Sequence, residues 1–153
     1  AQFYIRANER KVVDEVVQKV RNIADGAALM TGASVAISNY ELSYDNMVTN
    51  NVLSDVFTKN LKAHSPHPVY PAVAATGSAD MGNVSQVVPA IHPFVGMNKP
   101  GLVFHTKEFA DQTITKDGET AIADAVLSLA QTGYDIMTDQ DLLSAIKTEF
   151  EKR

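Results

Sequence analysis

Two polar stretches of this 153-residue chain hold side chains of the kinds that bind ligands or move protons. The first, GSADMGNVSQVVPAIHP at residues 77–93, carries Asp80, Asn83 and His92 among small and apolar residues. The second, HTKEF at residues 105–109, begins with His105. A glycine-containing loop lets backbone amides approach a bound molecule closely, and imidazole serves as metal ligand or proton carrier. Each group also has a structural alternative, so the pattern alone assigns no role.

The alternatives differ in weight between these residues. Asp80 is either a ligand-facing carboxylate or the N-cap of a short helix over 81–87, and the two readings are equally supported. Arg6 lies on the polar face of an extended stretch, where its guanidinium suits a carboxylate, although a surface arginine is the more frequent case. His92 lies in an apolar segment and is expected to be a core histidine bonded to backbone. His105 lies in a loop that enters a helix, a common place for ligand-binding groups.

The remaining histidines, His64 and His67, are expected in a solvated loop. Pro66 and Pro68 prevent the helical geometry that would bring the two imidazoles together, which disfavours a closed four-histidine zinc site.

Composition excludes several classes of protein. The formal net charge of −5 provides no basic surface for a nucleic-acid backbone, so no nucleic-acid partner is expected. The absence of cysteine excludes disulfides, thiolate zinc sites and a cysteine nucleophile. Apolar runs are too short for a membrane span, and the N-terminal residues of the chain lack a signal-peptide pattern, so no membrane partner is expected and a cytoplasmic location is favoured.

Apolar periodicity predicts strands and helices in alternation, an α/β fold. Residues 2–7 and 34–38 alternate as strands around a helix over 9–31 that has Asn8 as N-cap and Gly32 as its stop. Two strands and one helix do not close a core, so this unit lacks its other half. Further on, we expect a helix over about 47–61, a buried strand over 90–97, a helix over 118–137 and a last helix that begins at Thr138 with Asp141 in a capping box.

Taken together, GSADMGNVSQVVPAIHPF, HTKEF, FYIRAN and MVTNNVL resemble the metal-dependent aminoacylase and carboxypeptidase family of amidohydrolases, in particular its aminobenzoyl-glutamate hydrolase and HmrA-type members. The resemblance spans nearly the whole chain. It implies an α/β fold in which residues 1–40 are the second half of an α+β, ferredoxin-like lid and dimerisation domain. Residues 45–153 would then be the C-terminal part of a dinuclear-metal, aminopeptidase-like catalytic domain.

The resemblance also implies roles for individual residues. Arg6 matches the lid arginine that holds the substrate carboxylate, and Gly77, Ser78 and Asp80 match a loop beside the substrate. His105 matches a metal-ligand histidine. The other ligands and the catalytic carboxylates of the family have no counterpart here, so no catalytic residue is expected in this chain, and the chain alone is expected to be inactive.

The implied function is a share in a metallopeptidase or amidohydrolase reaction. Such an enzyme would use two divalent ions, zinc or manganese, to cleave an amide next to a free carboxylate in an N-acyl amino acid, a dipeptide or an aminobenzoyl-glutamate type of substrate. The expected partners are the N-terminal remainder of the same protein, a second copy bound through the lid domain and a small-molecule or peptide substrate. The alternative is a non-enzymatic α/β binding or dimerisation module.

Overall fold

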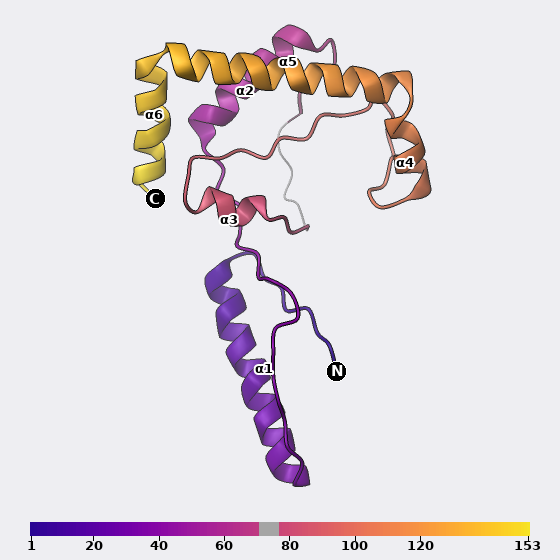
Figure 1. The fold of residues 1–153 in the computed structure, drawn as a ribbon, viewed down its shortest axis with the longest axis vertical. Coiled ribbons are helices and arrows are strands. Elements are labelled where there is room, and N and C mark those ends of the chain that lie inside the picture. The colour runs from indigo at the N-terminus through magenta and orange to yellow at the C-terminus, as the bar shows by residue number, and fades with distance from the viewer. Residues whose placement is uncertain (71–76) are drawn as a thin grey trace. The chain divides into compact units, whose positions relative to one another are not determined.

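The structure is a computed structural model that describes residues 1–70 and 77–153 of the chain. Among these residues it contains six helices and no β-strand (Figure 1). The helices are α1 (Arg10–Thr31), α2 (Asn51–His64), α3 (Met81–Ser85), α4 (Lys107–Thr113), α5 (Lys116–Thr138) and α6 (Gln140–Glu151).

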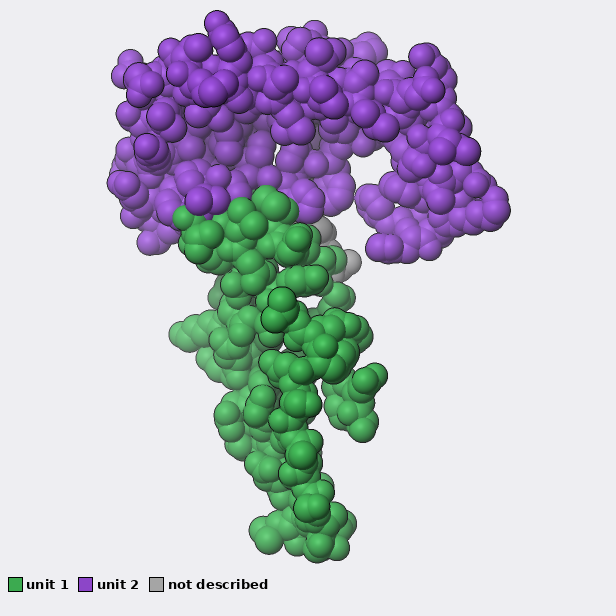
Figure 2. Space-filling model, in the orientation of Figure 1, with its two compact units in different colours: residues 1–48, 76–87 green, residues 49–75, 88–153 purple. Residues whose placement is uncertain are grey.

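The chain divides into two compact units, which Figure 2 shows in different colours. Unit 1 contains Ala1–Val48 and Thr76–Val87, and therefore holds α1 and α3. Unit 2 contains Thr49–Ala75 and Val88–Arg153, and holds the other four helices. The expected division into a lid portion at 1–40 and a catalytic portion at 45–153 stays a prediction.

The expected α/β fold, with a catalytic domain and half of a ferredoxin-like lid, is wrong for the described residues, because none of them forms a strand. Residues 2–7 and 34–38 make no backbone hydrogen bond to a backbone group of residues 1–70 or 77–153. Residues 90–97, expected as a buried strand, are also irregular. Alternating apolar residues favour an extended backbone, but a strand also requires a neighbouring strand whose N–H and C=O groups it pairs with. No such neighbour is present among the described residues.

In unit 1, α1 confirms the helix that was predicted from the valine-rich periodicity. It ends where Gly32 takes a left-handed backbone conformation, with φ of 71°, and the N–H of Gly32 donates to the carbonyl of Ala28. The predicted cap at Asn8 is wrong. The backbone N–H of Arg10 instead donates to Oδ1 of Asn46 at 3.1 Å, so a residue 36 positions away satisfies one donor of the first turn.

The short helix α3 belongs to unit 1 because Asn83 ties it to residues 43–45. Oδ1 of Asn83 accepts from the backbone N–H of Asp45 at 3.0 Å, and its Nδ2 donates to the carbonyl of Ser43 at 3.2 Å. Gly82 is buried directly against this segment, and a Cβ there would lie 1.9 Å from the Asp45 carbonyl oxygen. Glycine is therefore required for the close approach.

In unit 2, α2 packs on α5, and α6 contacts both of these helices. The junction is polar and buried: Asn50 is fully buried, its Oδ1 accepts from the N–H of Leu53, and its Nδ2 donates to the Ile146 carbonyl at 3.0 Å. The carboxylate of Glu149 accepts from the backbone N–H groups of Asn51 and Val52, both at 2.8 Å. One side chain from α6 thus satisfies donors at the beginning of α2.

The helix α5 confirms the predicted helix over 118–137. The buried residues of α5, however, are not its large apolar residues. Its buried positions are small or polar, which allows close packing: Gly118, Ala121, Asp124, Ser128 and Thr132. Six larger apolar side chains of α5 are exposed, namely Ile122, Val126, Leu127, Leu129, Tyr134 and Met137.

The ends of the other predicted helices are shifted. The second helix begins at Asn51 rather than near residue 47, because Asn50 caps it. Thr138 does not cap the last helix: its hydroxyl donates to the Tyr134 carbonyl, and Asp139 accepts from the N–H groups of Asp141 and Leu142. Within the described ranges, no helix combines the length and the apolar character that a membrane crossing needs.

Candidate functional site

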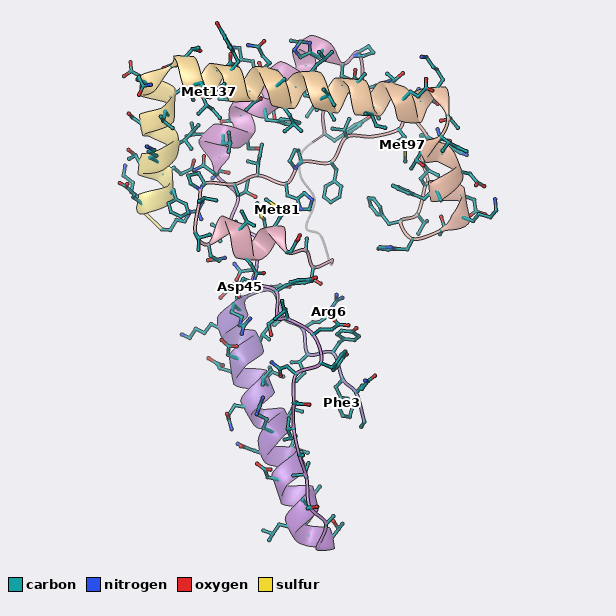
Figure 3. The ribbon with its side chains drawn as sticks, in the orientation of Figure 1. Phe3, Arg6, Asp45, Met81, Met97 and Met137 are labelled. Atoms are coloured by element: carbon teal, nitrogen blue, oxygen red, sulfur yellow. The ribbon has the colours of Figure 1, made fainter. Side chains whose placement is uncertain are left out.

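Arg6 and Ser78 are two of the sequence-predicted substrate-binding residues, and the structure brings them together. Arg6 lies on the extended stretch before α1 and is labelled in Figure 3, and both side chains are exposed. Nη2 of Arg6 donates to Oγ of Ser78 at 2.9 Å. A guanidinium has five N–H donors, and within residues 1–70 and 77–153 this is its one side-chain hydrogen bond, so other donors can bind an anionic group.

Gly77 and Asp80 flank this contact in the loop before α3, and both are exposed. Asp80 occupies the N-cap position of α3, but its side chain makes no capping hydrogen bond. Asn83, on α3 itself, holds the helix against residues 43–45 and is therefore a positioning residue for the loop. The loop thus exposes the Ser78 hydroxyl and the Asp80 carboxylate, and the hydrogen bonds of Asn83 hold it in place.

Tyr4 lies two residues before Arg6, and its phenol is hydrogen-bonded at the surface. Its ring contacts that of Tyr40 at 5.8 Å between centroids, and its hydroxyl donates to Oε1 of Glu41 at 3.0 Å. The neighbouring Tyr40 phenol, followed by the Glu41 carboxylate, raises the pKa of Tyr4 to about 12. Tyr4 is consequently uncharged at neutral pH and adds no negative charge beside Arg6.

His105, the predicted metal ligand, lies in unit 2 immediately before Thr106, the N-cap of α4. Its side chain is exposed, and its backbone has the left-handed φ of 65° that residues with a Cβ rarely adopt. Among the described residues, no group of three or more His, Cys, Asp or Glu side chains could hold a metal ion. The part of the chain that the structure describes therefore does not make a metal centre by itself.

The other histidines behave differently from His105. His64 is the last residue of α2, and His67 is half-buried in the following loop. His92 was expected in the core, but it is exposed and stacks on Phe94, with ring centroids 5.5 Å apart. Of the apolar neighbours that suggested burial, Ala90 is buried, but Ile91 is half-buried and Phe94 is exposed, and the described residues contain no sheet that this segment could join.

Sequence reasoning missed the aromatic residues around HTKEF. Phe94 lies 5.8 Å from Phe104, and Phe104 lies 4.9 Å from Phe109, measured between ring centroids. The only sequence signal is three phenylalanines within sixteen residues, and such residues are ordinarily assigned to the core.

Comparison with known proteins gives a distant relationship along almost the whole chain. No protein-family model matches the sequence. The chain is 28% identical over 152 residues to a Xaa-Arg dipeptidase from Mus musculus and 26% identical over 152 residues to one from Homo sapiens. These alignments cover 97% of this chain and 35% of each relative, so the chain spans about a third of the length of the curated relatives that it matches.

Proposed function

We propose that this chain contributes substrate-binding and metal-binding residues to a metal-dependent amidohydrolase or peptidase that cleaves an amide bond next to a free carboxylate. The relationship to Xaa-Arg dipeptidases over 97% of the chain supports a role in peptide hydrolysis. The observation that carries the proposal is the 2.9 Å contact between Arg6 and Ser78. The family resemblance matches these two residues separately to substrate binding, and 72 positions separate them.

In this proposal Arg6 binds the substrate carboxylate. A guanidinium and a carboxylate form charge-assisted hydrogen bonds in a fixed planar geometry, which orients the neighbouring amide. Ser78 restrains the guanidinium by accepting one of its hydrogen bonds. Gly77 and Asp80 border the same loop, where they can contact the group that follows the carboxylate.

His105 is proposed as one ligand of a metal centre that two divalent ions, zinc or manganese, would occupy. The described part of this chain offers no cluster of three or more ligands, so its residues alone do not fit the centre. The remaining ligands and the proton-transferring carboxylate would come from the rest of a longer protein. The 153-residue chain by itself is accordingly proposed to be inactive.

The carboxylate-binding role of Arg6 can be tested in the full-length gene product. Arg6→Ala should lower kcat/KM for dipeptides with a free carboxylate by about 10- to 150-fold, which corresponds to roughly 1.5–3 kcal/mol. The same dipeptides with an amidated C-terminus should be cleaved slowly and equally by both proteins. Arg21→Ala, at a half-buried position of α1, is the arginine control. An unchanged kcat/KM on the free carboxylates would refute the role of Arg6.

The metal-binding role of His105 calls for a separate measurement. His105→Ala should lower both the metal content of the full-length protein and its activity, whereas His64→Ala and His67→Ala should leave both unchanged. Full metal occupancy in the His105 variant would contradict the assignment. Turnover by the purified 153-residue chain with added zinc or manganese would show that the chain carries a complete site, contrary to the proposal.

A further inference from the structure

A row of aromatic side chains leads to the loop that carries His105. The rings of His92 and Phe94 are stacked, at 5.5 Å between centroids and an interplanar angle of 24°. Phe94 contacts Phe104 at 5.8 Å, and Phe104 contacts Phe109 at 4.9 Å. Phe104 is the residue directly before His105. The row therefore includes the residue that precedes the proposed metal ligand in sequence, and it ends at Phe109.

The central members of this aromatic row are exposed rather than buried. Phe94 is 69% exposed and Phe104 is 56% exposed. Contiguous exposed apolar side chains mark places where another molecule binds, because removing their apolar surface from water is favourable. The ring contacts already restrict the torsions of these side chains, so the side chains lose less conformational freedom when a ligand stacks on them.

The backbone around the row is held in an uncommon conformation. His105 has φ of 65°, and Asn98, in the loop before it, has φ of 48°. The hydroxyl of Thr106 accepts from the N–H of Phe109 and donates to the Val103 carbonyl at 2.8 Å, which closes the turn around His105. Such conformations persist where surrounding contacts fix them, and they concentrate at binding and catalytic sites.

The same loop borders an open hollow of about 330 Å³, which is in the size range of small-ligand sites. Its lining is mostly aliphatic, with Pro100, Leu102 and Val103, and the charges of Lys99 and Glu108 are of opposite sign. An uncharged apolar group suits such surroundings better than a cation does.

We propose that Phe94 and Phe104 bind the bulky apolar or aromatic group on the acyl side of the scissile amide. This inference rests on the proposed function, in which His105 binds a metal at the bond to be cleaved. Phe94 and Phe104 then determine which acyl groups are accepted.

The test compares two substrates that differ only in the acyl group. N-benzoyl and N-acetyl derivatives of the same amino acid are assayed with the full-length protein. Phe94→Ala and Phe104→Ala should each lower the ratio of kcat/KM values, benzoyl over acetyl, by about tenfold, mainly through KM. Phe104→Leu keeps an apolar side chain and should retain an intermediate ratio. Tyr134→Ala, which removes an exposed aromatic ring from α5, should leave the ratio unchanged.

Each other result overturns the inference in a recognisable way. Equal losses on both substrates would show that the phenylalanines support the fold rather than select the acyl group. An unchanged ratio in all three variants would show that another surface, such as the remainder of the longer protein, covers the row. A wild-type protein that cleaves neither substrate nor any dipeptide would refute the proposed function itself, whereas the first two results would leave that function standing.

Discussion

The guanidinium of Arg6 donates from Nη2 to Oγ of Ser78 at 2.9 Å, so the extended N-terminal stretch and the loop before α3 meet through their side chains. Both groups are exposed. The contact orients Arg6 without neutralising it, because a hydroxyl is an uncharged acceptor. A bound carboxylate would therefore meet a positioned cation.

Removal of the Ser78 hydroxyl should weaken substrate binding through Arg6. In the full-length protein, Ser78→Ala should lower kcat/KM on free-carboxylate dipeptides about 2- to 10-fold, the worth of one restraining hydrogen bond. In an Arg6→Ala background the same change should have little further effect, as steady-state kinetics of the double-mutant cycle will show. Ser144→Ala on the exposed face of α6 is the control. Additive losses would mean that Ser78 acts independently of Arg6.

Glu149 should make the stability of the chain depend on pH in the acidic range. Its pKa is lowered, first by the backbone N–H of Val52 and then by that of Asn51, which both donate to the carboxylate. A lowered folded-state pKa gives stability that is present above the unfolded-state pKa and is lost as pH falls through the folded value. We expect the urea concentration at the unfolding midpoint of the 153-residue chain to decrease when the pH is lowered below about 4.5.

Glu149→Gln should lower this midpoint at neutral pH and reduce its dependence on acid. Glu108→Gln is the matched control, since its carboxylate is exposed and makes no hydrogen bond or ion pair with a described residue. Identical pH curves for wild type and Glu149→Gln would show that the contact to the start of α2 contributes nothing.

Asp124 should be a source of instability in the isolated chain. It is 6% exposed on the buried face of α5, and its Oδ2 has no hydrogen-bond partner among the described residues. Burial of an unpaired carboxylate oxygen is unfavourable, so Asp124→Asn should raise the free energy of unfolding by about 1 kcal/mol in urea titrations. Asp55→Asn, at an exposed position of α2, should change it little. A destabilised Asp124→Asn variant would indicate that the carboxylate is paired.

Two glycines of α5 should respond to alanine in opposite directions. A Cβ at Gly118 would lie 2.4 Å from the Thr113 carbonyl oxygen, so Gly118→Ala should destabilise the chain by about 1–3 kcal/mol. At Gly133 a Cβ would meet no atom within 4 Å, and Gly133→Ala should stabilise by about 0.5–1 kcal/mol through helix propensity. Thermal or urea unfolding of both variants gives the comparison. Equal effects at the two sites would contradict the packing of α4 against the start of α5.

The sequence predicts structural features that depend on neighbouring residues, such as a helix. It does not predict features that depend on residues far away in the chain, such as strand pairing. The spacing of valines and the glycine at position 32 are sufficient for α1, because helix formation and termination are local. Residues 2–7 were expected to form a strand from their alternation, but no described backbone pairs with them. The caps show the same limit: Asn46, not Asn8, accepts from the first backbone N–H of α1, across 36 residues.

The same distinction between local features and features set by distant residues applies to the candidate site. Arg6 and Ser78 were each identified by resemblance, while their contact arises only from the fold of unit 1. His92 was expected to be buried because its neighbours are apolar, yet it is exposed beside Phe94. Phe94 and Phe104 carry no signal in sequence that distinguishes an exposed binding residue from a core residue.

The connectivity of unit 1 limits how evolution or engineering can recombine this chain. Unit 1 is assembled from Ala1–Val48 and Thr76–Val87, with α2 encoded between them. A recombination point after Val48 would take Asn83 and residues 43–45 from different parent proteins. The Asn83 amide is hydrogen-bonded to the backbone of Ser43 and Asp45, so the two segments must fit each other. The same recombination point would also exchange Arg6 without Ser78. A chimera that exchanges unit 1 by itself therefore needs three junctions, after residue 48, before residue 76 and after residue 87, whereas one junction after residue 87 transfers both segments together with α2.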